Sequence, residues 1–176
     1  DLDVYYVGHP LVEIISKEKK NKNLLQLKFT KPVIALLPGS RKQEIKKMMP
    51  VFKSVIHHFS DYEFIIAGVS NIGKEWYSEI LKDDKIKIVY DKTYDLLKRS
   101  TAAIVTSGTA TLETALFNVP QIVCYKSSLF SYLVGKLFIK LKFISLVNLI
   151  LNKDAVKELI QDDLNTKNIK KELEII

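Results

Sequence analysis

The chain is poor in cysteine, because Cys124 is the only one among its 176 residues. An intrachain disulfide is therefore excluded. A chain of this length needs none, since one core can bury about 70% of the surface that the unfolded chain exposes. Cys124 lies in an apolar run, so we expect a small buried side chain rather than a nucleophile. A reducing, cytoplasmic setting fits this composition.

Secretion signals are also lacking, because the chain does not open on a basic segment followed by an apolar run. The first residue is not methionine, and residues 1–7 read DLDVYYV, which is typical of a strand already under way. We therefore expect the sequence to be a piece of a longer protein.

Several catalytic signatures are missing as well. We expect no metal site at His57 and His58, and His9 lies in a turn whose glycine and proline can serve shape alone. The sequence contains no Ser-His-Asp set, nucleophile elbow, Walker loop or dinucleotide-binding glycine pattern. Its aromatic residues show no RNA-binding signature.

The composition is that of a folded domain with a basic surface. Apolar residues make up 47% of the chain and aromatic residues 10%, which argues against disorder. The net charge is 27 − 20 = +7, which favours an anionic partner: nucleic acid, a phosphorylated metabolite or a membrane surface. Composition alone does not choose among these three.

Short β-rich runs alternate with amphipathic segments along most of the chain. This alternation predicts an α/β fold with a Rossmann-like parallel sheet covered by helices on both faces. Helical spacing runs from Ile45 to Phe59, where Pro50 is expected to break or kink the helix or to open a second one. Shorter helices are expected around Trp76–Leu81 and Tyr94–Lys98. The expected strands are Val33–Leu37, Glu63–Ala67, Lys87–Tyr90, Ala102–Thr106 and Gln121–Tyr125.

Ligands bind such sheets beyond the carboxyl ends of the strands, so the loops after each strand are informative. The first such loop is LPGSRKQEI at residues 37–45. Gly39 permits a sharp turn, and Ser40 with Gln43 fits a capping box at a helix start. Arg41 is not explained by the cap, because a cation is unfavourable at that end of a helix. A bound phosphate would resolve the conflict and suits the forked guanidinium.

The second loop is VTSGTATLE at residues 105–113, where a strand leads into a helix expected from Leu112 to Phe117. Free N–H groups beside a glycine form an anion site, although a capped helix is an equally good explanation for this loop taken alone. Glu113 would fall in the first turn, where the helix dipole favours an acid.

Residues 129–150 are apolar almost all round but carry Lys136, Lys140 and Lys142. These charges argue against a spanning helix. We expect a buried helix followed by a strand for much of the stretch. A basic, apolar helix that touches an anionic bilayer is the alternative.

These loops and their neighbours resemble the lipid-A-disaccharide synthase family. The matching segments occur in the family's order: VGHPL at 7–11, LPGSR with EI at 37–45, SGTATLE at 107–113, PQIVCYK at 120–126, SLVNLI at 145–150 and KELIQ at 157–161. The resemblance implies the C-terminal domain of a GT-B glycosyltransferase. Residues 31–176 would bind the UDP-sugar donor, and residues 1–30 would form an interdomain strand, linker and polar loop.

The resemblance also assigns roles to residues of this chain. Arg41 would be catalytic, binding the diphosphate and stabilising the leaving UDP, and Glu113 would accept the ribose hydroxyls. The segment from Glu158 to Gln161, expected as a helix, would close the donor site together with Asn148. The residues that would contact the phosphates are Gly39, Ser40, Arg41, Ser107, Gly108 and Thr109.

The implied reaction transfers 2,3-diacylglucosamine from UDP to 2,3-diacylglucosamine 1-phosphate. The donor is UDP-2,3-diacylglucosamine, and neither a metal nor a further cofactor is expected. The general base and the acceptor pocket would lie in an N-terminal half, and the family continues beyond residue 176. The expected setting is cytoplasmic and peripheral to the inner membrane, with a possible homodimer and no nucleic acid.

Three other functions stay open from the sequence. A UDP-sugar epimerase or another GT-B glycosyltransferase would share the donor loops and Glu113. A non-catalytic module could bind nucleic acid through the +7 charge, with steep salt dependence. A membrane-anchoring module would need residues 129–144 exposed.

Overall fold

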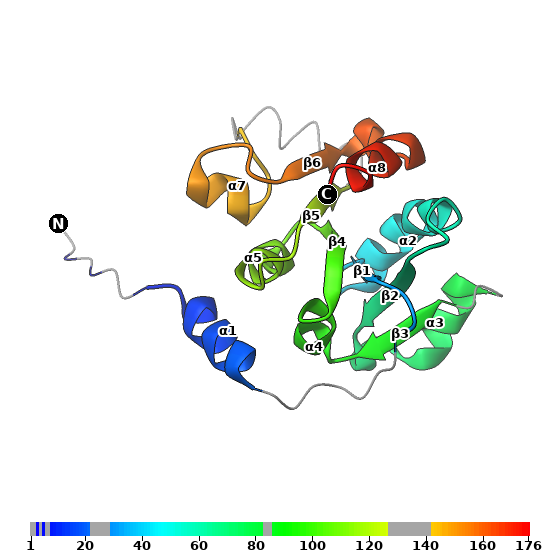
Figure 1. The fold of residues 1–176 in the computed structure, drawn as a ribbon, viewed down its shortest axis with the longest axis horizontal. Coiled ribbons are helices and arrows are strands. Elements are labelled where there is room, and N and C mark those ends of the chain that lie inside the picture. Colours follow the sequence, from blue (N-terminus) through cyan, green and yellow to red (C-terminus); the bar gives the residue numbers. More distant parts are fainter. Residues whose placement is uncertain (1–2, 4, 6–7, 22–28, 83–85, 127–141) are drawn as a thin grey trace.

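The computed structural model describes residues 3, 5, 8–21, 29–82, 86–126 and 142–176. Within them lies a six-stranded sheet of order β3-β2-β1-β4-β5-β6, in which every neighbouring pair is parallel (Figure 1). The strands are β1 Val33–Leu37, β2 Glu63–Gly68, β3 Lys87–Tyr90, β4 Ser100–Thr106, β5 Gln121–Tyr125 and β6 Lys157–Ile160.

Helices cover both faces of the sheet, as the alternation of patterns predicts. On one face, α2, α3 and α8 pack against β1, β2 and β4–β6; on the other, α1, α4 and α5 pack against the same central strands (Figure 1). The helices are α1 Pro10–Lys20, α2 Lys42–Ile56, α3 Lys74–Leu81, α4 Thr93–Leu97, α5 Thr109–Leu116, α7 Leu146–Leu151 and α8 Thr166–Leu173, with short 3₁₀ turns η1 Ser70–Ile72 and η2 Gln161–Asp163.

The central strands are apolar because both of their faces are buried. All five residues of β1 are buried, and their side chains alternate between two hydrophobic clusters. Ile34 and Leu36 face α2, whereas Val33, Ala35 and Leu37 face the other layer. A parallel strand buried on both sides needs such an uninterrupted apolar run. The five strands expected from the sequence are confirmed.

The prediction that KELIQ forms a helix is wrong, because Lys157–Ile160 is the edge strand β6. Only Leu159 is fully buried in this strand, and its pairing with β5 fixes the extended backbone. The strand expected near the end of residues 129–150 is also wrong, since Leu146–Leu151 forms α7. Residues 127–141, on which most of that prediction rests, lie outside the described residues.

Pro50 does not divide its segment into two helices, because α2 runs as one helix from Lys42 to Ile56, and the expected kink stays a prediction. A proline leaves the carbonyl four residues earlier without its helical partner. Here Pro50 and Lys46 are both exposed, so water can reach that carbonyl. The opposite face of α2 is anchored in the core by Ile45, Met48, Met49, Phe52 and Val55.

The N-terminal segment differs from the expected polar loop. Helix α1 extends to Lys20 and buries Ile15, so Ser16–Lys20 is helical. His9 caps this helix, since its Nδ1 accepts a hydrogen bond from Leu11 N at 3.2 Å, and Pro10 occupies the first helical position. The strand expected over residues 1–7 lies almost entirely outside the described residues, and the division at residue 30 stays a prediction.

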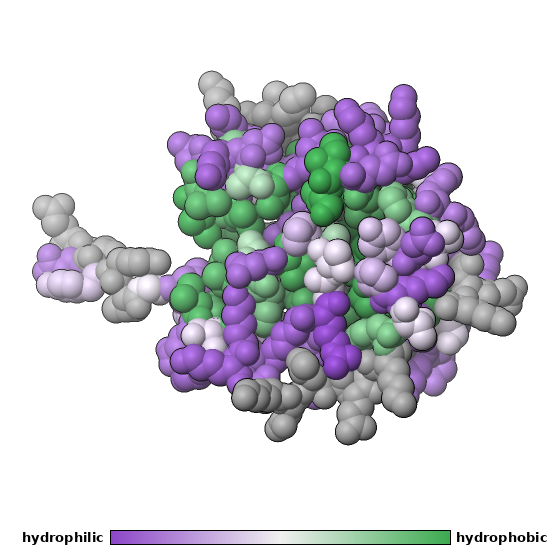
Figure 2. Space-filling view, in the orientation of Figure 1, coloured by the Kyte–Doolittle hydropathy of each residue, from purple (hydrophilic) through white to green (hydrophobic). Residues whose placement is uncertain are grey.

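One apolar surface stands out on α7. Figure 2 shows hydrophobic residues over this helix, where Leu149, Ile150 and Leu151 are 36, 62 and 51% exposed. In the described part of the chain, no helix combines the length and the hydropathy that crossing a membrane requires.

Candidate functional site

A cavity of about 320 Å³ opens where the strand order reverses, at the carboxyl ends of β1 and β4. In doubly wound sheets this is the position at which ligands bind. The cavity wall contains both loops that the sequence singles out. Its lining residues are Leu37, Gly39, Ser40, Arg41, Glu44, Ala67, Val69, Thr93, Thr106, Ser107, Gly108, Thr109, Ala110 and Glu113.

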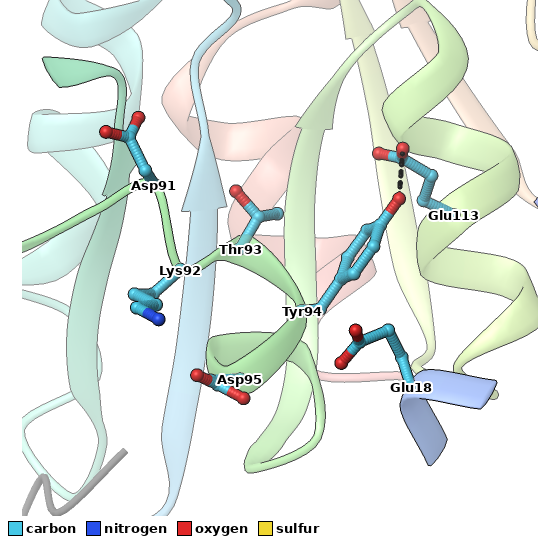
Figure 3. A pocket seen from close by; sticks show the side chains of 7 residues that line it. All are labelled: Glu18, Asp91, Lys92, Thr93, Tyr94, Asp95 and Glu113. Atoms are coloured by element: carbon cyan, nitrogen blue, oxygen red, sulfur yellow. Dashed lines mark hydrogen bonds between the residues drawn. The ribbon is translucent and has the colours of Figure 1, made fainter. Parts of the chain in front are cut away.

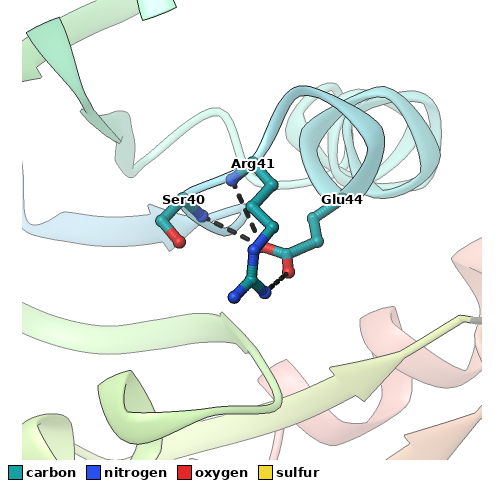
Figure 4. Close-up of polar contacts among 3 residues, drawn as sticks. All are labelled: Ser40, Arg41 and Glu44. Carbon is teal, nitrogen blue, oxygen red and sulfur yellow. Dashed lines mark hydrogen bonds and ion pairs between the residues drawn. The ribbon is translucent and has the colours of Figure 1, made fainter. Parts of the chain in front are cut away.

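The loop after β1 is organised by Glu44 (Figure 4). Glu44 Oε2 accepts hydrogen bonds from the backbone N–H groups of Ser40 at 3.1 Å and Arg41 at 3.3 Å. Glu44 Oε1 pairs with Arg41 Nη1 at 2.7 Å. The expected capping box between Ser40 and Gln43 is therefore wrong by one residue: Arg41 is the N-cap, and Glu44 stands three residues after it.

The charge of Arg41 is therefore already opposed by the Glu44 carboxylate, so its place at the helix start does not require a bound anion. The Arg41 side chain is nevertheless 79% exposed. A guanidinium carries five N–H donors, and Glu44 takes a small part of them. Arg41 thus lines the cavity with most of its donors unused by Glu44, while one edge of the guanidinium is held.

Gly39 is required by the same arrangement. Its φ is +113°, and a Cβ at this position would lie 2.6 Å from Glu44 Oε2 and 2.9 Å from Glu44 Cβ. A side chain there would displace the carboxylate that holds Ser40 and Arg41.

The loop after β4 offers backbone donors at the start of α5. This helix begins at Thr109, three residues earlier than expected, with Gly108 as its N-cap. The first N–H groups of a helix have no partner within it, which applies to those of Thr109 and Ala110, two residues that line the cavity. Gly108 has an extended backbone, and a Cβ there would meet nothing within 4 Å. Its missing side chain therefore leaves space in the cavity rather than relieving strain.

Ser107 serves the structure through both of its donors. Its N–H donates to the Cys124 carbonyl at 2.8 Å, and its hydroxyl donates to the Ile144 carbonyl at 3.1 Å. These bonds join the end of β4 to β5 and to the segment before α7. Ser107 lines the cavity together with Gly108 and Thr109, and the phosphate contacts of all three stay a prediction.

Glu113 lies in the second turn of α5, because the helix starts earlier than predicted. The helix dipole acts on the first turn, so it does not account for this acid. Glu113 Oε1 accepts a hydrogen bond from the Tyr94 hydroxyl at 2.9 Å (Figure 3). Burial, followed by this bond to the carboxylate, raises the pKa of Tyr94 to about 12. The sequence analysis missed Tyr94, which it used only to mark a helix.

A second cavity of about 390 Å³ adjoins the first and shares Thr93 and Glu113 with it (Figure 3). Its other lining residues are the acids Glu18 of α1 and Asp91 and Asp95 around α4, together with Lys92 and Tyr94. Among the residues described, no three His, Cys, Asp or Glu side chains gather into a possible metal site.

Asn148 and Glu158 are brought together with each other but not into the wall of the first cavity. Asn148 is fully buried, and its amide bonds to the backbone of residues 155–156 and to Glu158. Glu158 accepts from the N–H groups of Ile144 and Ser145 at 3.0 and 2.9 Å. Gln161 begins η2 with φ +52°. Asn148 and Glu158 thus order the segment that receives the Ser107 hydroxyl.

The parallel sheet, with its cavity and two donor-rich loops at the strand-order reversal, defines an α/β Rossmann-like domain of the GT-B kind. Solved structures share this fold. A UDP-GlcNAc 2-epimerase from Methanocaldococcus jannaschii, in complex with UDP-GlcNAc and UDP, superposes with a TM-score of 0.59 at 18% identity, over 97% of this chain and 47% of that one. ADP-heptose lps heptosyltransferase II from E. coli gives 0.57 at 13% identity, over 97% and 52%.

The sequence itself matches the family model of lipid-A-disaccharide synthetase over residues 1–175. Lipid-A-disaccharide synthase from Syntrophus aciditrophicus is 35% identical over 98% of this chain and 48% of its own length. The Campylobacter jejuni enzyme of the same name is 38% identical over 93% and 46%. The chain therefore belongs to the lipid-A-disaccharide synthetase family, and it spans about half the length of these relatives.

Proposed function

We propose that this chain is the donor-binding half of a lipid-A-disaccharide synthase and that its cavity holds UDP-2,3-diacylglucosamine. The observation that carries the proposal is the convergence of Arg41, the start of α5 and Glu113 on one cavity at the strand-order reversal. The sugar would pass to 2,3-diacylglucosamine 1-phosphate, forming a β-1,6 disaccharide and UDP. The related 2-epimerase structure, which is a complex with UDP-GlcNAc and UDP, supports this choice of ligand.

The roles in the reaction follow from charge. Inverting transfer breaks the bond between the sugar and the diphosphate, so negative charge grows on the leaving UDP. Arg41 and the N–H groups of Thr109 and Ala110 would offset that charge, while Gly39, Ser40 and Gly108 shape the approach to them. Glu113 would hold the ribose.

Asn148, Glu158 and Gln161 would contribute indirectly in this proposal. The first two hold residues 144–145, whose carbonyl binds the Ser107 hydroxyl, so they would fix the far side of the donor loop. Gln161 follows β6 on the same edge of the sheet.

The acceptor and its general base would come from the rest of the longer protein. Positioning of two reactants can supply roughly 7–11 kcal/mol of a barrier. A chain with one wall of the cleft would therefore bind UDP without forming disaccharide. Disaccharide formation by the 176-residue chain would contradict this part of the proposal.

The proposed setting is the cytoplasmic surface of the inner membrane, with peripheral attachment and a possible homodimer. The net charge of +7 and the exposed aliphatic residues of α7 support contact with an anionic bilayer. Sedimentation with anionic and neutral vesicles tests the attachment, since binding to neither would contradict it.

Titration calorimetry with UDP tests the donor site, with ADP and a short single-stranded DNA as controls. Selective saturation by UDP is expected. Arg41→Ala should weaken binding by about 1.5–3 kcal/mol, or roughly 10- to 150-fold, because a charge-assisted hydrogen bond is lost. Arg99→Ala removes the same charge before β4, at the opposite end of the strand, and should bind UDP as the wild type does. Binding of DNA without UDP would refute the donor site.

A UDP-sugar epimerase remains a second candidate, because the 2-epimerase fold matches over nearly all of the chain. Incubation with UDP-GlcNAc and analysis of the sugar distinguishes the two. Formation of an epimer would favour this candidate.

A further inference from the structure

Tyr94 is fixed beside the carboxylate of Glu113 from two sides. Its hydroxyl donates to Glu113 Oε1 at 2.9 Å, and its ring packs on Phe117 with centroids 5.3 Å apart and planes tilted by 46°. Tyr94 comes from α4, whereas Glu113 and Phe117 belong to α5 and its C-cap. The phenol is thus a contact between two helices, and it lines the acidic cavity beside Glu113, which borders both cavities (Figure 3).

Glu113 has no cap or ion pair of its own helix to orient it, because it lies in the second turn of α5. A glutamate side chain is long and loses considerable rotamer freedom when it is held in one position. The Tyr94 hydroxyl engages Oε1, which leaves Oε2 as the acceptor available to a ligand. The hydroxyl is a donor at neutral pH, because the ordinary pKa of a tyrosine is already about 10 and burial raises it further.

We propose that Tyr94 is a positioning residue that aims the free oxygen of Glu113 at the ribose hydroxyls of the nucleotide, and so sets the preference for ribose over deoxyribose. The inference rests on the proposed donor site and adds a specificity-determining residue to it. A site built to bind a hydroxyl discriminates strongly against the analogue that lacks it, since its own polar group is then left unpaired. That discrimination depends on where the carboxylate points.

The test compares UDP with 2′,3′-dideoxy-UDP by titration calorimetry on the full 176-residue chain. The wild type should prefer UDP by about tenfold or more, the value of a hydrogen bond to a charged group. In Tyr94→Phe the ring contact with Phe117 is kept, and the preference should fall toward parity through weaker UDP binding. Affinity for the dideoxy ligand should change little.

Two further variants separate positioning from a general loss of structure. Tyr62→Phe makes the same chemical change at a tyrosine 38% exposed and outside both cavities, and it should keep the wild-type preference. Glu113→Gln should itself lower the preference, and adding Tyr94→Phe to it should lower it no further. If the double variant lost the sum of the two single losses in preference for UDP, the inference would be overturned, because Tyr94 and Glu113 would then act independently.

Three other outcomes would separate a failure of the Tyr94 role from a failure of the proposed donor site. Equal weakening of both ligands in Tyr94→Phe, with the preference intact, overturns the positioning role while leaving the donor site standing. Wild-type binding of UDP without preference for ribose removes the role of Glu113 and the inference with it. Absence of any UDP binding refutes the proposed function itself.

Discussion

Asn148 was predicted from the sequence to contact the ligand, but its hydrogen bonds indicate that it stabilises the fold. Its amide makes four hydrogen bonds: Nδ2 donates to the Val156 carbonyl at 2.8 Å and to Glu158 Oε1 at 2.9 Å, and Oδ1 accepts from the N–H groups of Ala155 at 2.8 Å and Val156 at 2.9 Å. These bonds use the full capacity of the amide. Replacing Asn148 by alanine should therefore destabilise the protein without removing a ligand contact.

The size of the loss follows from the partners. Each neutral hydrogen bond contributes about 0.5–1.5 kcal/mol, and the bond to the Glu158 carboxylate about 1.5–3 kcal/mol. Ala155 is exposed and Val156 half-buried, so water can replace part of what their backbone groups lose. We expect Asn148→Ala to lower the free energy of unfolding by about 3–4 kcal/mol, near the upper end for a single substitution.

Urea unfolding followed by circular dichroism measures this change, with linear extrapolation to zero denaturant. Asn168→Ala is a matched control, because Asn168 Nδ2 makes one exposed bond, to the Asp163 carbonyl at 2.9 Å. The control should lose about 1 kcal/mol or less. If Asn148→Ala kept wild-type stability but lost UDP affinity as strongly as Arg41→Ala, Asn148 would be a ligand contact and our reasoning from its bonds would be wrong.

Four other perturbations test the same site. Gly108→Ala should leave stability within about 0.5 kcal/mol in urea unfolding yet weaken UDP binding, since its methyl group enters open cavity space. Gly39→Ala should lower the free energy of unfolding by about 1–3 kcal/mol, because the new side chain meets both a positive φ and a clash with Glu44. Equal stability of Gly39→Ala and Gly108→Ala would contradict this. Glu44→Gln should lower both stability and UDP affinity by freeing Arg41, whereas tighter binding would mean that Glu44 competes with the phosphate. The pKa of Tyr94 is about 12 in the folded chain, whereas the phenol of the unfolded chain loses its proton near pH 10. The free energy of unfolding should therefore fall as the pH rises from about 10 to 12. Urea midpoints measured across this range should fall less for Tyr94→Phe than for the wild type, and the same pH dependence in both would contradict the raised pKa.

Most of the strands that the sequence predicts are buried on both faces, and the edge strand Lys87–Tyr90 is predicted because three of its four residues favour strands. In Val33–Leu37 every residue is apolar, because each contacts one of the two helical layers. The edge strand Lys157–Ile160 has no such run, since one buried leucine is enough for a strand with a single neighbour. Its extended form depends on pairing with β5, which local sequence does not encode.

The two loops that line the cavity could be located from the sequence because their turn and helix-start signals are local. Gly39, Arg41 and the start of α5 follow directly from strands, and the topology then brings them together at one cavity. The register of the first cap was missed by one residue, because Gln43 and Glu44 are both acceptable capping partners in sequence. Only the geometry shows that the carboxylate of Glu44 reaches two backbone N–H groups and the guanidinium together.

The part of the site that the sequence did not predict depends on contacts between separate elements. Tyr94 and Glu113 are separated by β4 in the chain, yet the parallel crossover returns α5 beside α4 and joins them. The same crossover sets Glu113 between a cavity lined by phosphate-suited donors and a cavity lined by acids. In the proposed site, a nucleotide whose phosphates met Arg41 would extend its ribose toward Glu113 and the acidic cavity, whose carboxylates disfavour a phosphate there. The strand-order reversal would then set the direction of the ligand as well as its position.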